Sequence, residues 1–103
     1  MVRVVTNASL FRQKQGEEIR VRIHNPSRNL AFPIHLSLVD AKSGEEVLPV
    51  LWENNYISLL PGEARTVSAR IDSASGPLRL EASGWNIEAK TAAVTEAAGN
   101  TGR

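Results

Sequence analysis

The sequence predicts an all-β fold, a sandwich of roughly seven to eight short antiparallel strands. Three observations favour this fold class. Apolar and polar residues alternate with the period of a strand, turn-forming Gly, Pro, Asn and Asp recur every ten residues or so, and no segment has the apolar periodicity of a stable helix. Because strands of this length and spacing are typical of immunoglobulin-like sandwiches, we expect that architecture.

Three strands are predicted in the first part of the chain. Residues 2–6 alternate between apolar and polar, and this pattern is lost at Asn7-Ala8-Ser9, where we expect the first strand to end. Residues 19–24 alternate most regularly and end before Pro26, which cannot donate to a strand ladder. A third strand, residues 32–38, places Phe32 on the same apolar face as Ile34, Leu36 and Leu38.

The middle of the chain predicts a short edge strand and a hairpin. Residues 47–52 are apolar, and Pro49 confines that strand to an edge. Residues 56–60 and 66–71 are two further strands, separated by Pro61-Gly62. Proline presets φ for the second position of a turn and glycine supplies the positive φ of the third, so we expect a type II turn here.

The last part of the chain has a weaker strand pattern. Residues 78–83 alternate, and Gly84 permits a bend before residues 85–87. From Ala89 to Val94 we expect strand content to fade, and residues 92–98 are too short and too weakly amphipathic for a helix. We expect residues 1–94 to form the sandwich domain and residues 95–103 to form a flexible C-terminal tail.

Length and charge exclude several classes of function. A chain of 103 residues is one domain with a single core. Lys+Arg number 12 and Asp+Glu 11, and the basic residues are scattered, so neither nucleic acid nor an anionic membrane is an expected partner. The absence of cysteine excludes disulfides and thiol catalysis. Without a signal peptide or an apolar run of ~18 residues, the chain is expected to be a cytosolic protein or a piece excised from a larger one.

Catalytic constellations are not evident in the sequence. Glycosidases need two carboxyl groups roughly 5–9 Å apart in a cleft, one with a raised pKa. The carboxylates here fall in turns and on polar faces, and no Gly-x-Ser-x-Gly turn is present. His24 and His35 would lie on the outward faces of neighbouring strands and approach each other, but no spacing supplies the other ligands of a metal site. We therefore expect no catalytic residue, metal or cofactor.

The aromatic residues are the stronger candidates for a site. The segment Trp52-Glu53-Asn54-Asn55-Tyr56 sets two aromatic rings beside amides at a strand break, a combination that contacts sugars. Trp52, Asn54, Asn55 and Tyr56 are therefore the predicted substrate-binding or interdomain-contact residues. The favoured alternative is that Trp85 is the core tryptophan while Trp52 and Tyr56 pack against a neighbouring domain.

Several motifs occur together along the chain: Gly16-Glu17-Glu18-Ile19, Asn25-Pro26-Ser27, Ala31-Phe32, the stretch from Pro49 to Val67, and Ser83-Gly84-Trp85-Asn86. Jointly they resemble the C-terminal immunoglobulin-like domain of family 2 glycoside hydrolases, with exo-β-D-glucosaminidases and β-mannosidase-like enzymes as the nearest members. The positions carried over from the resemblance are structural by their chemistry: Asn55, Leu60, Pro61, Gly62, Glu63, Gly84, Trp85 and Asn86.

The resemblance implies a role without catalysis. In that family the catalytic glutamates lie in a separate (β/α)₈ barrel that accessory sandwiches flank. It therefore implies a fragment of an exported bacterial exo-glycosidase (periplasmic or extracellular), whose partners are the catalytic barrel and neighbouring domains, with carbohydrate as a further candidate. Two alternatives stay open: a free-standing carbohydrate-binding module and a bacterial surface-protein repeat.

Overall fold

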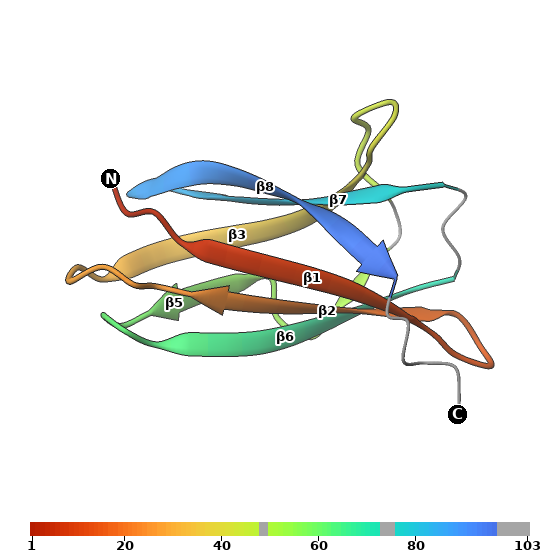
Figure 1. The fold of residues 1–103 in the computed structure, drawn as a ribbon, viewed down its shortest axis with the longest axis horizontal. Helices are drawn as coiled ribbons and strands as arrows, with labels where there is room; N and C mark the ends of the chain where they lie inside the picture. The colour runs from red at the N-terminus through yellow and green to blue at the C-terminus, as the bar shows by residue number, and fades with distance from the viewer. Residues whose placement is uncertain (48–49, 73–75, 97–103) are drawn as a thin grey trace.

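The computed structural model describes residues 1–47, 50–72 and 76–96, which form strands and no helix. Within these ranges no helix exists that could cross a membrane. The strands are β1 (Val5–Arg12), β2 (Glu17–His24), β3 (Ala31–Asp40), β4 (Leu51–Trp52), β5 (Tyr56–Leu59), β6 (Ala64–Ile71), β7 (Leu78–Gly84) and β8 (Ile87–Glu96) (Figure 1). The all-β prediction is confirmed.

All described strands belong to one curled sheet with the order β4-β6-β2-β1-β8-β7-β3-β5. Its two halves face each other as the layers of a sandwich, and the shortest extent of the molecule is 19 Å. The halves are joined where β1 pairs with β8, with Ala8 opposite Val94. This pairing is parallel, whereas every other described strand pairing is antiparallel, so the expectation of a wholly antiparallel fold is wrong at this seam.

The core fills the space between the layers with the alternating apolar residues. Its centre is formed by side chains that are at most 1% exposed, among them Ile19, Val21 and Ile23 of β2 and Ile34, Leu36 and Leu38 of β3. Each such side chain stabilises the fold by about 1.5–3 kcal/mol relative to leaving it exposed. The predicted inward faces of β2, β6 and β7 are confirmed, and that of β3 is confirmed at Ile34, Leu36 and Leu38.

The first and the last strand extend well beyond their predicted ends. β1 continues through Asn7-Ala8-Ser9 to Arg12. Ala8 is buried and its polar neighbours face outward, so this small residue continues the alternation of the strand. β8 runs from Ile87 to Glu96, where fading was expected, because it is paired with β7 on one side and β1 on the other. The last strand thus passes the expected end of the sandwich domain at residue 94, and residues 97–103 lie outside the described ranges.

Phe32 does not join the core as expected. The register between β3 and β5 shifts between Ala31 and Ile34, so Ala31 takes the buried position and Phe32 is exposed. An irregularity of one residue moves a side chain to the other face, because the side-chain period of a strand is two.

The edge strand and the turn agree with the sequence. β4 pairs only with β6 and so forms one edge of the sheet, although Pro49 itself lies outside the described residues. At the β5–β6 turn, Gly62 has a φ of 80° and the Glu63 N–H donates to the Leu60 carbonyl at 2.9 Å. The expected reversal at Pro61-Gly62 is confirmed.

Candidate functional site

The predicted segment 52–56 connects the two edge strands of the curled sheet, β4 and β5. At its start, the Glu53 N–H donates to the Ser68 carbonyl at 2.8 Å, and the Glu53 carboxylate accepts from the Ser68 N–H at 3.1 Å. At its end, the Asn55 carbonyl accepts from the Leu36 N–H at 2.9 Å. The segment is therefore tied to β6 of one half and to β3 of the other.

The two aromatic rings of this segment have different environments. Trp52 is half-buried and packs against the hydrophobic core. Tyr56 is exposed and stacks on His35, with 4.5 Å between ring centroids and 24° between ring planes. Asn54 Oδ1 accepts from the Tyr56 N–H at 3.2 Å, so Asn54 shapes the turn. The structure brings Asn54 and Tyr56 together, whereas Trp52 pairs with Ala69 in one half of the sheet and Tyr56 pairs with His35 in the other half.

The two histidines do not approach each other. β2, which ends at His24, lies between β6 and β1, whereas β3, which carries His35, lies between β7 and β5. The expectation that these strands are neighbours is wrong, because the chain crosses to the other layer at the β2–β3 loop. Within the described ranges no three His, Asp or Glu side chains gather as metal ligands would.

Trp85 is not the core tryptophan. It occupies the β7–β8 hairpin tip and is 87% exposed. Its neighbour Asn86 bridges the tip to the β2–β3 loop: Asn86 Nδ2 donates to the Leu30 carbonyl at 2.7 Å, and Asn86 Oδ1 accepts from the Phe32 N–H at 3.0 Å. Leu30 and Phe32 are also exposed, and these three apolar side chains are called the apolar end below. In Figure 1 the β7–β8 hairpin tip and the β2–β3 loop lie at the end of the molecule at which the N-terminus is marked.

Sequence reasoning missed the apolar end as a unit. The available signal was local: Trp85 stands between Gly84 and Asn86 in a tight hairpin, and a side chain at such a tip points away from both sheets. Leu30 stands at the end of a turn rather than within a strand. That the two segments meet depends on the Asn86 hydrogen bonds, which connect residues more than fifty positions apart and have no sequence pattern.

A buried asparagine holds the next turn of the same end. Asn25 is 0% exposed, and its Nδ2 donates to the carbonyls of Asn29 at 2.7 Å and Leu59 at 3.1 Å. Its Oδ1 accepts from the Ser27 N–H at 3.0 Å. The backbone of Asn25 also bonds to Gly62 and Glu63 of the β5–β6 turn. One side chain thereby connects the β2–β3 loop to the β5–β6 turn.

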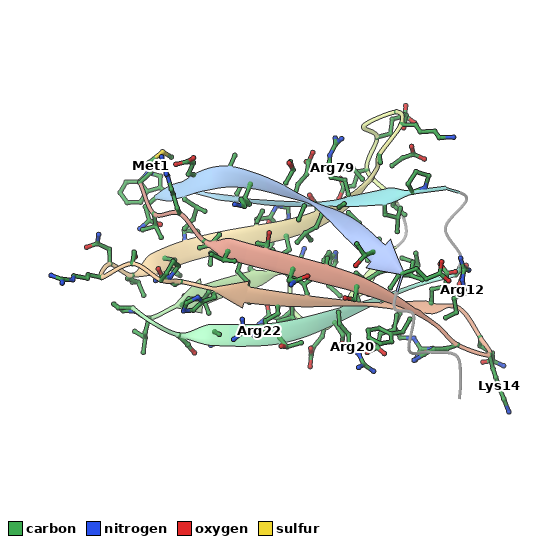
Figure 2. All side chains as sticks on the ribbon, in the orientation of Figure 1. Met1, Arg12, Lys14, Arg20, Arg22 and Arg79 are labelled. Atoms are coloured by element: carbon green, nitrogen blue, oxygen red, sulfur yellow. The ribbon has the colours of Figure 1, made fainter. Side chains whose placement is uncertain are left out.

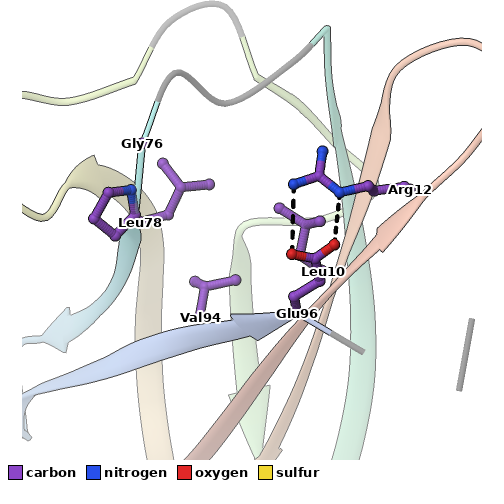
Figure 3. A pocket seen from close by; sticks show the side chains of 7 residues that line it. Leu10, Arg12, Gly76, Leu78, Val94 and Glu96 are labelled. Atoms are coloured by element: carbon purple, nitrogen blue, oxygen red, sulfur yellow. Dashed lines mark hydrogen bonds and ion pairs between the residues drawn. The ribbon is translucent and has the colours of Figure 1, made fainter. Parts of the chain in front are cut away.

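The opposite end of the sandwich contains an open cleft of about 370 Å³, lined by Leu10, Arg12, Gly76, Pro77, Leu78, Val94 and Glu96 (Figure 3). Arg12 Nε donates to Glu96 Oε2 at 2.6 Å, and Arg12 Nη1 donates to the buried carboxylate of Glu17. The hydrogen bond from Arg12 and its positive charge hold the pKa of Glu96 below its ordinary value. A carboxylate with a lowered pKa is ionised at neutral pH and so is a poor general acid.

Comparison with known proteins identifies the family. The family described as exo-beta-D-glucosaminidase Ig-fold domain matches residues 1–87. The chain belongs to this family. The Ig-fold domain is 42% identical to an exo-beta-D-glucosaminidase of Arthroderma benhamiae over 71 residues, 38% to one of Streptomyces avermitilis over 77 residues and 39% to one of Hypocrea jecorina over 77 residues. These matches cover 69%, 71% and 74% of the 103-residue chain.

The Ig-fold domain corresponds to a small part of each relative. The matched region spans 8% of the length of each of these three proteins. The resemblance to the exo-β-D-glucosaminidase domain is confirmed, whereas a bacterial parent is not established, since the relatives come from fungi as well as from a bacterium. No solved structure matches the Ig-fold domain.

Proposed function

We propose that this Ig-fold domain is a non-catalytic accessory module of a larger family 2 glycosidase with exo-β-D-glucosaminidase activity, and that it packs on the catalytic barrel. The observation that carries the proposal is the match of residues 1–87 to the Ig-fold domain of proteins of which it spans only 8%. A domain that folds as one unit and makes up only a small share of its relatives serves as a module of a larger chain.

The hydrogen bonds and ion pairs of three glutamates support a module without catalysis. Glu17 and Glu96 are bound to Arg12 at the cleft, and Glu63 accepts hydrogen bonds from the Leu60 N–H at 2.8 Å and from Arg65 at 3.1 Å. The bond from the Leu60 N–H, followed by the contact with Arg65, lowers the pKa of Glu63. Retaining or inverting glycosidases instead need one carboxyl group with a raised pKa. Glu63 and Glu96, whose pKa values are lowered, do not supply such a group.

The test compares the 103-residue chain with the longer protein that the proposal requires. We expect the chain alone to release no glucosamine from chitosan oligosaccharides, and the longer protein to release it. Deleting the Ig-fold domain from the longer protein is expected to lower its melting temperature, because a covered surface of the barrel is then exposed. Sugar release by the chain alone, or a reading frame without a glycosidase barrel, would refute the accessory role.

A second candidate function, carbohydrate binding by the domain itself, is favoured by the exposed Tyr56–His35 stack. Flat aromatic surfaces stack on sugar rings, and Ser83 lies opposite His35 on the neighbouring strand as a hydrogen-bonding group. Titration with chitosan, mannan and galactan oligosaccharides tests this candidate, with Tyr56→Ala as the decisive variant. Trp52→Ala is a poorer choice, because Trp52 packs on the core and its loss also weakens the fold.

A further inference from the structure

We propose that the apolar end, formed by Leu30, Phe32 and Trp85, is the surface through which the Ig-fold domain docks onto the rest of its own polypeptide. This inference rests on the proposed function, since it specifies which face of the module meets its neighbour. The occupant is another part of the same chain, not a sugar and not a second copy.

The first argument is the exposure of large apolar groups in one place. Trp85 is 87% exposed, Phe32 is 53% exposed and Leu30 is 46% exposed. A tryptophan alone presents on the order of 150–250 Å² of surface that can be buried. Aromatic residues that stand together in this way mark interaction surfaces, because interface cores are enriched in them and isolated soluble domains expose few contiguous apolar patches.

The second argument is that the apolar end is held in place by hydrogen bonds and by a close approach of two backbone segments. Asn86 connects the hairpin tip to the Leu30–Phe32 segment with two hydrogen bonds. Gly84 lies so close to the Pro33 carbonyl oxygen that an added Cβ would stand 1.9 Å from it. A surface that is already ordered loses less conformational entropy on docking than a mobile loop would.

The third argument is the composition of the rim. Arg3 and Glu88, next to the hairpin tip, form an ion pair at 2.8 Å, and Arg65 pairs with Glu63 at 3.1 Å beside the β5–β6 turn. Charges at the rim of an interface stay in contact with water, so docking of the apolar centre does not have to desolvate them. An apolar centre with a polar rim is the usual anatomy of a protein interface.

The identity of the occupant follows from the relatives. The matched region spans 8% of each compared relative, so in these relatives the domain is part of a much longer chain. The residues of the apolar end all lie within the matched residues 1–87. A neighbouring domain of the same chain is present at a high effective concentration, which lets an apolar surface of moderate size stay covered. At the end of the sandwich opposite the apolar end, the cleft carries the Arg12–Glu96 ion pair; Arg12 is labelled in Figure 2.

The experiment is hydroxyl-radical footprinting of the 103-residue chain and of the longer protein that contains it. In the longer protein we expect the oxidation rate of Trp85 to fall by roughly tenfold, as for a ring that passes from a free surface to an interface core. Phe32 should be protected in parallel. Tyr56 and Leu51, which are also exposed but lie elsewhere, are the matched controls and should react at similar rates in both proteins.

Variants test the same surface energetically. In the longer protein, Trp85→Ser combined with Phe32→Ser should let the Ig-fold domain melt as a separate calorimetric transition, whereas Leu51→Ser should not. The double variant should fold normally in the 103-residue chain, because both side chains are exposed there. A double variant that melts together with the rest of the longer protein, as the unsubstituted protein does, would contradict the inference.

The remaining outcomes separate this inference from the proposed function. If Trp85 stays reactive while Tyr56 or Leu51 becomes protected, the domain docks by another face: the inference is overturned and the accessory role stands. If none of the four side chains becomes protected, the inference is overturned, and the melting temperature of the longer protein without the Ig-fold domain decides whether the domain packs on the parent chain by a face that carries none of them. If the 103-residue chain sediments as a dimer that Trp85→Ser dissociates, the occupant is a second copy and the inference is also overturned.

Discussion

Asn25 illustrates how a single polar side chain can hold two loops at one end of a sandwich. It is fully buried, and its amide group donates to carbonyls on both the β2–β3 loop and the β5 end while accepting from Ser27. Buried polar groups stabilise a fold only when their partners are present, because an unpaired one keeps its desolvation penalty. The contribution of Asn25 therefore depends on its complete set of bonds.

Asn25→Ala is expected to lower the free energy of unfolding by about 2 kcal/mol or more, since it removes the amide that donates to the Leu59 and Asn29 carbonyls. Urea denaturation followed by tryptophan fluorescence measures this change. Asn54→Ala is the matched control: it removes an exposed turn bond and should change the stability by less than about 0.5 kcal/mol. Equal losses in the two variants would contradict this account of Asn25.

Gly62→Val tests backbone conformation apart from packing. Gly62 has a φ of 80° and no atom within 4 Å of an added Cβ, so the cost is conformational strain of about 1 kcal/mol or more. Gly76 also has open space around an added Cβ but no φ in the left-handed region, which makes Gly76→Val the control. The difference between the two melting temperatures measures the strain. Indistinguishable melting would mean that the turn tolerates a side chain at this position.

At the scale of elements, β8 is held by its neighbours more than by its own side chains. Its middle is exposed on both faces, and only Ile87 is fully buried. Backbone pairing with β7 and β1 supplies the order, and the Arg12–Glu96 ion pair fastens its last residue to β1. The small and polar residues of β8 therefore predict less strand than the structure contains.

The Arg12–Glu96 pair makes part of the stability depend on pH. The pKa of Glu96 is lowered in the folded state, so the pair stabilises the fold above the ordinary pKa of a glutamate and loses this effect as the pH falls through the lowered value. Glu96→Gln should therefore lower the unfolding free energy at neutral pH and have little effect in acid. Urea titrations of both proteins at several pH values measure this, and high salt should shrink the difference because the pair is exposed. A difference that is independent of pH would contradict the assignment.

For the whole molecule, the seam between β1 and β8 joins the two halves of the curled sheet into one sandwich. Without it, β1 and β8 would each become an edge, and exposed edges pair with other chains. The apolar end and the Ig-fold core therefore depend on β8. The family matches residues 1–87, so every residue of β8 except Ile87 lies beyond the matched part.

A chain that ends at residue 87 is therefore expected not to fold, whereas a chain that ends at residue 96 should keep the cooperative unfolding of the full chain. The physical reason is the loss of both backbone ladders of β8, which no side chain replaces. Circular dichroism melting and size-exclusion chromatography measure the outcome. A cooperative, monomeric chain of residues 1–87 would show that the seam is dispensable.

Local patterns in the sequence were sufficient for the fold class, for the inward faces of β2, β3, β6 and β7, for the turn at Pro61-Gly62, and for the motifs of the family. These features depend on residues next to one another, through the period of two in a strand and the φ preferences of proline and glycine. Only the tertiary structure decided that β8 closes the sheet in parallel with β1, that Phe32 and Trp85 face outward, and that Trp52 packs inward while Tyr56 stacks on His35. Those outcomes are set by pairing and hydrogen bonds between segments far apart in the chain, which leave no periodic trace in the sequence.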